Sequence, residues 1–103
     1  MSNSEKLEAL KAFLKENGIE YEENHWSHCK TMIDLQIKRL MIAVHLSDDS
    51  DEVFHDKVKR HYKPFFIRDN ESIDFILEKM QNCIVERMVW QQKQWEKKQK
   101  KEK

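Results

Sequence analysis

The chain has 103 residues, of which 37% are charged, 39% hydrophobic and 10% aromatic. This length predicts one domain, and the periodic apolar residues exclude a disordered chain. Basic and acidic residues balance at 19 each, but residues 1–52 hold eleven acids and six bases, whereas residues 53–103 hold eight acids and thirteen bases. The basic second half permits contact with nucleic acid or with an acidic partner.

No apolar run approaches the ~18 residues that a membrane span requires, and the N-terminus lacks the apolar segment of a secretory signal. Cys29 and Cys83 do not form a C-x-x-C pair, and two cysteines are too few for a disulfide framework. We therefore expect a cytoplasmic protein with reduced thiols and no membrane partner.

An amphipathic helix is predicted over residues 4–17. The apolar positions that repeat along it are Leu7, Leu10 and Leu14. We expect Ser2 or Ser4 to cap its start, and Gly18, the only glycine, to end it in a left-handed conformation. The alternation in residues 19–24 then predicts a short strand, and residues 25–30 a polar connection.

The segment 31–47 organises the rest of the chain, because two alternating runs in it predict a β-hairpin. One face is almost wholly aliphatic, and its residues are Ile33, Leu35, Ile37, Leu40, Ile42, Val44 and Leu46. If Lys38-Arg39 is a two-residue turn, Asp34 lies opposite Ala43, with His45 as its diagonal neighbour on the other face.

The second half continues with a helix, a strand and a final helix. Helical spacing predicts a helix over residues 51–62, with capping candidates at Asp48, Asp49 and Ser50 and with Pro64 ending it. Residues 64–69 read as the fourth strand, and we expect Asp69 or Asn70 to cap the last helix. Its predicted apolar stripe consists of Ile73, Ile76, Leu77, Met80, Ile84 and Met88.

We therefore expect one α/β domain over residues 1–88 and a basic helical extension or tail over residues 89–103. Its element order is αβββαβα, in three layers, with a small mixed four-stranded sheet built around an antiparallel hairpin.

This element order, together with three short motifs, resembles the PD-(D/E)XK nuclease superfamily, in particular proteins related to very-short-patch-repair endonucleases. The motifs are Ile33-Asp34-Leu35, Leu40-Met41-Ile42-Ala43-Val44 and Lys63-Pro64-Phe65-Phe66-Ile67-Arg68. The resemblance covers about residues 5–85 and implies a restriction-endonuclease-like fold.

In that superfamily a second-strand Asp and a third-strand Glu hold a divalent metal, with a Lys two positions later. Asp34 matches the Asp, His45 stands at the Glu position, and Ser47 stands where the Lys is expected. The resemblance thus implies a catalytic and metal site of Asp34 and His45, which would take Mg²⁺ or Mn²⁺, with Lys57 or Lys59 as the source of the missing charge. Because imidazole is a poor Mg²⁺ ligand and Ser47 carries no charge, we expect a degenerate nuclease.

Other side chains could form sites of their own. Glu20 and Glu22 could add oxygen ligands beside Asp34, although charged strand residues more often face water. The group His25, His28 and Cys29 lacks the second ligand pair that a zinc site normally has.

A basic set surrounds an aromatic cluster in the second half of the chain, a combination that suits phosphate contact. We expect nucleic acid to be bound by Lys57, Lys59, Arg60, Lys63 and Arg68. Trp90 and Trp95 lie beyond the core stripe of the last helix and are candidates for a homodimer interface.

Three functional hypotheses follow. The first is a nucleic-acid-associated, catalytically degenerate nuclease-like protein. The second is a small homodimeric interaction module that uses the last helix, and the third is an active metal-dependent nuclease.

Overall fold

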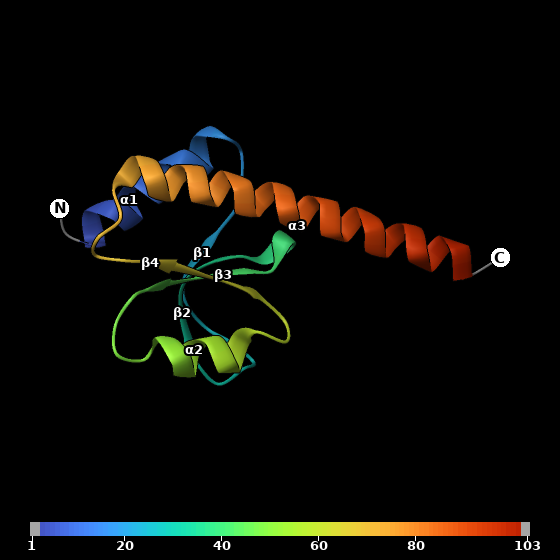
Figure 1. Ribbon diagram of the computed structural model, residues 1–103, viewed down its shortest axis with the longest axis horizontal. Helices are drawn as coiled ribbons and strands as arrows, with labels where there is room; N and C mark the ends of the chain where they lie inside the picture. The colour runs from blue at the N-terminus through green and yellow to red at the C-terminus, as the bar shows by residue number, and fades with distance from the viewer. Residues whose placement is uncertain (1–2, 102–103) are drawn as a thin grey trace.

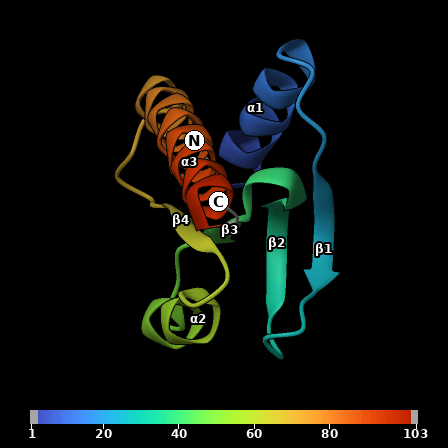
Figure 2. The same ribbon diagram turned by 90° about the vertical axis from the view of Figure 1, so that its right-hand side faces the viewer.

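The computed structural model describes the backbone of residues 3–101 and the side chains of residues 3–97. A four-stranded sheet lies between two helical layers, with α1 and α3 on one face and α2 on the other (Figures 1 and 2). In chain order the elements are α1 (Asn3–Glu16), β1 (Glu22–Trp26), β2 (Met32–Ile37), the 3-10 helix η1 (Lys38–Leu40), β3 (Ile42–Leu46), α2 (Asp51–Val58), β4 (Lys63–Ile67) and α3 (Ile73–Lys101).

The strands lie in the order β1-β2-β3-β4. β2 is antiparallel to both β1 and β3, whereas β3 and β4 are parallel and are joined by the α2 crossover. The predicted α/β plan, its element order and its mixed sheet are confirmed.

The turn of the central hairpin was predicted wrongly. Ile37 pairs with Ile42 rather than Leu40, because η1 and Met41 form a four-residue connection. A tight two-residue hairpin turn needs positive φ at its first central residue or at both, which Lys38 and Arg39 do not favour. Here Met41 takes the left-handed conformation (φ 55°). The shift of two residues preserves the faces, and continuing the register puts Asp34 directly opposite His45 instead of Ala43.

The first helix ends as predicted. Gly18 has φ 67°, and the Ile19 and Gly18 N–H groups donate to the carbonyls of Leu14 and Lys15, which is the hydrogen-bond pattern of a Schellman motif. Ser4 lies inside α1 rather than at its cap, and Ser2 lies outside the described residues.

The first strand begins at residue 22 rather than 19 and includes two residues assigned to the connection. Ile19 and Tyr21 pack against the core before the chain joins the sheet. Pairing with β2 then runs from Glu22 opposite Gln36 to Trp26 opposite Met32.

The crossover helix α2 is shorter than predicted and ends at Val58, six residues before Pro64. The Val58 carbonyl accepts the N–H of Tyr62, which turns the chain back towards the sheet. Pro64 lies inside β4, which tolerates a proline because it is an edge strand.

The final helix begins at Ile73, so neither Asp69 nor Asn70 is its cap. Asp69 and Asn70 occupy a turn closed by the Glu71 N–H, which donates to the Arg68 carbonyl. The Ser72 hydroxyl caps α3 instead, because it accepts the Phe75 N–H at 3.2 Å. The core stripe ends at Ile84, since Met88 is 57% exposed.

Two core clusters fill the space on either side of the sheet. The larger lies under α1 and α3 and contains Leu10, Leu14, Leu35, Ile37, Ile42, Val44, Ile76 and Met80 among others. The smaller lies on the α2 side and contains Ile33, Ala43, Phe54, Val58 and Tyr62. Ile33 was expected on the aliphatic face. Asn24, which precedes the partner of Ile33 on β1, has φ 49° and interrupts the regular backbone conformation of that strand.

Among the described residues, no helix combines the length and apolar character that a bilayer span requires.

Candidate functional site

His45 is held at the C-terminal end of β3, on the face that α2 covers. Its ring stacks on the Phe54 ring of α2, with centroids 4.4 Å apart and planes 15° apart, and meets the Phe66 ring edge-on at 5.9 Å. Only 8% of the residue is exposed. The alternation of β3 therefore places an imidazole inside a mostly apolar layer, with its two ring nitrogens directed towards polar groups.

One of these polar groups is Asp34 on β2. Its Oδ2 accepts the Leu46 N–H at 2.9 Å and lies 3.5 Å from His45 Nδ1. His45 Nδ1 is buried and has no hydrogen-bond partner among the residues that the structure describes. The expected neighbourhood of Asp34 and His45 is thus present, and the corrected register, continued by one residue past Leu35 and Val44, places them opposite each other.

The other polar groups come from the loop between β3 and α2. His45 Nε2 lies 3.2 Å from Asp48 Oδ1, 3.4 Å from Ser50 Oγ and 3.5 Å from Asp51 Oδ1. The backbone of Asp48 donates to Asp51 Oδ1, and Ser47 Oγ donates to Asp51 Oδ2. These bonds give the loop a defined shape around the imidazole.

Hydrogen bonds within this loop favour the ionised form of Asp48. The Ser50 hydroxyl and N–H donate to Asp48 Oδ1 and, together with His45, hold the pKa of that carboxyl below its usual range. Sequence reasoning treated Asp48 only as a helix cap and passed over Asp51. The spacing His-x-x-Asp-x-x-Asp at the end of a strand was the signal that could have found both.

The structure does not bring Lys57 or Lys59 to His45. Lys57 lies in the last turn of α2, at the end opposite Asp51, and its ammonium donates to the Lys30 carbonyl at 3.3 Å. Lys59 pairs with Asp56 at 3.5 Å. Neither side chain supplies the positive charge that the nuclease pattern expects beside Ser47.

The other candidate metal ligands from the sequence do not join the group around His45. Glu22 accepts a hydrogen bond from the Gln36 amide at 2.7 Å. The His28 ring packs against the His61 ring with centroids 4.7 Å apart. The group of potential metal ligands found among the described residues consists of His45, Asp48 and Asp51, and it includes neither Cys29 nor the histidines beside it.

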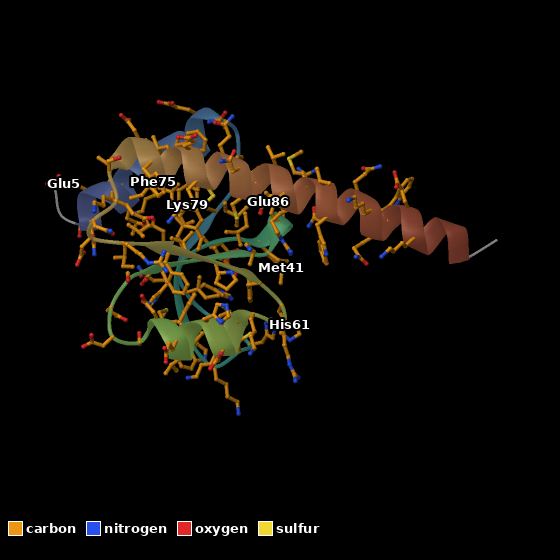
Figure 3. All side chains as sticks on the ribbon, viewed as in Figure 1. Glu5, Met41, His61, Phe75, Lys79 and Glu86 are labelled. Carbon is orange, nitrogen blue, oxygen red and sulfur yellow. The ribbon has the colours of Figure 1, made fainter. Side chains whose placement is uncertain are left out.

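Most of the expected nucleic-acid residues gather where α2 ends and β4 begins. Lys57, Lys59, Arg60 and Lys63 are exposed there, and the Lys63 N–H donates to the Met41 carbonyl, which brings this segment beside η1. Arg68 lies apart, at the other end of β4, with its guanidinium 5.4 Å from the Phe66 ring centre. We call the first group, together with Lys30, Lys38 and Arg39, the basic end. The labelled residues Met41 and His61 mark it in Figure 3.

The two interface tryptophans both lie on α3 but differ in their surroundings. Trp90 is 47% exposed, with the Arg87 guanidinium 4.3 Å from its ring centre. Trp95 is 56% exposed and lies past Gln91, whose amide donates to the Arg39 carbonyl. Beyond that contact α3 extends away from the sheet (Figure 1).

Comparison of the chain with protein-family models, with curated proteins and with solved structures finds no match. The nuclease resemblance therefore rests on the element order and the short motifs.

Proposed function

We propose that this protein is a restriction-endonuclease-like nucleic-acid-binding protein that contacts the phosphate backbone through its basic end. The observation that supports the proposal is the separation of charge along α2. Four acidic residues precede or begin the helix, namely Asp48, Asp49, Asp51 and Glu52, whereas the basic end lies where the helix finishes.

Helix electrostatics account for only part of this separation. A helix dipole favours acids at the first turn and bases at the last, which covers Asp51 and Lys57. It does not account for Arg60 and Lys63 in the next segment, or for Lys38 on η1. Bases collected from three separate elements favour binding of a polyanion such as nucleic acid.

Cleavage is not part of this proposal. Asp34 stands at the Asp position of the nuclease pattern, but His45 stands at the position of the second carboxylate. The Ser47 hydroxyl, at the position of the lysine, donates a hydrogen bond to Asp51. We expect labelled DNA and RNA to remain intact with Mg²⁺ or Mn²⁺. Metal-dependent cleavage that disappears in Asp34→Ala would establish the active nuclease instead.

Fluorescence anisotropy with labelled duplex and single-stranded DNA and RNA tests the binding. Arg60 is exposed at the basic end and forms no ion pair with the residues that the structure describes, so Arg60→Glu should weaken binding at least tenfold at low salt. Lys15→Glu makes the same charge change on the exposed last turn of α1 and should alter binding less than twofold. Equal losses in the two variants would contradict a localised interface, and no binding by the unaltered protein would overturn the proposal.

The second candidate function is a homodimeric interaction module that uses α3. It is favoured by apolar residues on the outward side of the helix, where Val85 is 54%, Met88 57% and Val89 49% exposed. Three such residues at helical spacing form a surface that a second helix can cover.

Sedimentation equilibrium of the full chain tests the dimer. Met88→Glu should convert a dimer to a monomer and leave nucleic-acid binding unchanged, whereas Gln94→Glu, on an exposed position of the same helix, should leave the dimer intact. If the unaltered protein is still monomeric at about 100 micromolar, this function is excluded.

A further inference from the structure

We propose that His45, Asp48 and Asp51 bind a divalent transition-metal ion of the Zn²⁺ type, with Asp34 holding the imidazole from behind. This ligand set differs from the pair Asp34 and His45 expected from the sequence. The ion would lie at Nε2 of the imidazole rather than at Nδ1, which faces Asp34. The metal proposal is independent of the proposed nucleic-acid binding.

Two of the three separations between the ligand atoms already match those that a metal requires. His45 Nε2 lies 3.2 Å from Asp48 Oδ1 and 3.5 Å from Asp51 Oδ1, and all three atoms lie within 4.8 Å of one another. Two ligand atoms that are each about 2.1 Å from a tetrahedral Zn²⁺ are about 3.4 Å apart. An ion can therefore enter with little movement of the loop.

An independent observation comes from the other nitrogen of the imidazole. His45 is 8% exposed and its Nε2 is directed into the cluster, yet its Nδ1 has no hydrogen-bond partner in the described part of the chain and faces Asp34 Oδ2 at 3.5 Å. A histidine that ligates a metal commonly donates its second N–H to a carboxylate. A metal at Nε2 would place the proton on Nδ1, where Asp34 can accept it.

Asp34 is itself positioned for this role. The Leu46 N–H donates to the same Oδ2 atom at 2.9 Å and fixes the carboxylate beside the ring. Asp34 is therefore a positioning residue for the imidazole rather than a ligand. This role explains why an acid stands between apolar residues on a central strand, and the explanation does not require the nuclease pattern.

The mixed donor set selects the class of ion. One imidazole nitrogen with two carboxylate oxygens suits Zn²⁺ or Mn²⁺ better than Mg²⁺, which prefers oxygen ligands and retained waters. Asp48 is 60% exposed at the side chain, so solvent can supply the remaining ligands. A groove of about 300 Å³ lined by Asp51, His55, Phe66 and Arg68, among others, lies beside the cluster.

Titration of the metal-free full chain with Zn²⁺, in competition with a chromophoric chelator, tests the site. We expect one equivalent to bind, with Mn²⁺ weaker and Mg²⁺ weaker still. Asp48→Asn should weaken Zn²⁺ binding at least tenfold. Asp49→Asn is the matched control, because it removes the same charge from the adjacent exposed residue outside the cluster, and it should bind as the unaltered protein does.

Two further readouts separate this site from other zinc ligands in the chain. Asp34→Asn should weaken binding about 10- to 100-fold, as expected for loss of a carboxylate behind a ligating histidine. The NMR signals of the His45 ring should shift on addition of Zn²⁺ and those of His25 should not. No binding at micromolar Zn²⁺, equal binding in Asp48→Asn and Asp49→Asn, or binding lost in Cys29→Ser would each overturn the proposal.

Discussion

Replacement of Glu71 by glutamine should destabilise the protein by about 2 kcal/mol at neutral pH. The Glu71 carboxylate accepts hydrogen bonds from Lys79 Nζ at 2.9 and 2.8 Å and from the Arg68 N–H at 2.9 Å. Its side chain is only 10% exposed. The amide can keep some of these contacts but loses the charge, and hydrogen bonds to a charged group contribute about 1.5–3 kcal/mol.

The same prediction has a pH dependence of definite sign. Burial alone would raise the pKa of Glu71, but the Lys79 ammonium and the Arg68 N–H outweigh it and leave the pKa below the usual range. A lowered folded-state pKa stabilises the fold above the unfolded value of about 4.3. That stabilisation is lost as the pH falls through the folded-state pKa.

Urea unfolding of the unaltered protein and Glu71→Gln between pH 3 and pH 7 measures both effects. The difference should be largest at pH 7 and shrink below about pH 4.3. Glu78→Gln, at an exposed position of the same helix, is the control and should change stability by less than 0.5 kcal/mol, as is usual at such sites (about ±0.5 kcal/mol). A Glu71→Gln difference near zero at pH 7, or one that grows on acidification, would refute the reasoning.

Two predictions concern other buried groups. Burial raises the pKa of the Cys83 thiol, so iodoacetamide should modify half-buried Cys29 first and Cys83 only on unfolding; equal rates would contradict this. The Tyr62 hydroxyl donates to Oε1 of Gln36, which is 2% exposed, so Tyr62→Phe should cost about 1–2 kcal/mol in urea unfolding. Tyr21→Phe removes a hydroxyl that forms no hydrogen bond with the described part of the chain and should be nearly neutral, and equal losses in the two variants would contradict the role of the hydrogen bond.

Local patterns in the sequence predict the elements because burying one face of a helix or strand against the core leaves a regular spacing of apolar residues in the chain. The leucines of α1, the alternation of the hairpin and the stripe of α3 are each visible in a short window. Boundaries were less predictable, since tertiary contacts decide them. Val58 ends α2 because Tyr62 turns back to reach Gln36, and Ser72 replaces the predicted caps because Glu71 closes a turn around Asp69 and Asn70.

The candidate site was predictable only where the alternation of a strand determines it. Asp34 stands out as an acid among apolar residues, and alternation places it on the face of His45. The exact pairing depended on the hairpin connection, where Met41 adopts a conformation that its residue type does not signal. The contribution of Asp51 depends on how the loop from residue 47 to residue 50 folds back over the ring, which no periodicity describes.

The salt dependence of duplex binding tests the central claim of nucleic-acid binding through the basic end most directly. Each phosphate contact contributes about 0.9 to the slope of log K against log salt concentration. The double variant Arg60→Gln/Lys63→Gln should therefore bind with a slope shallower by about 1.8, whereas Lys15→Gln should keep the slope of the unaltered protein. The same slope for the double variant and the unaltered protein would contradict the claim.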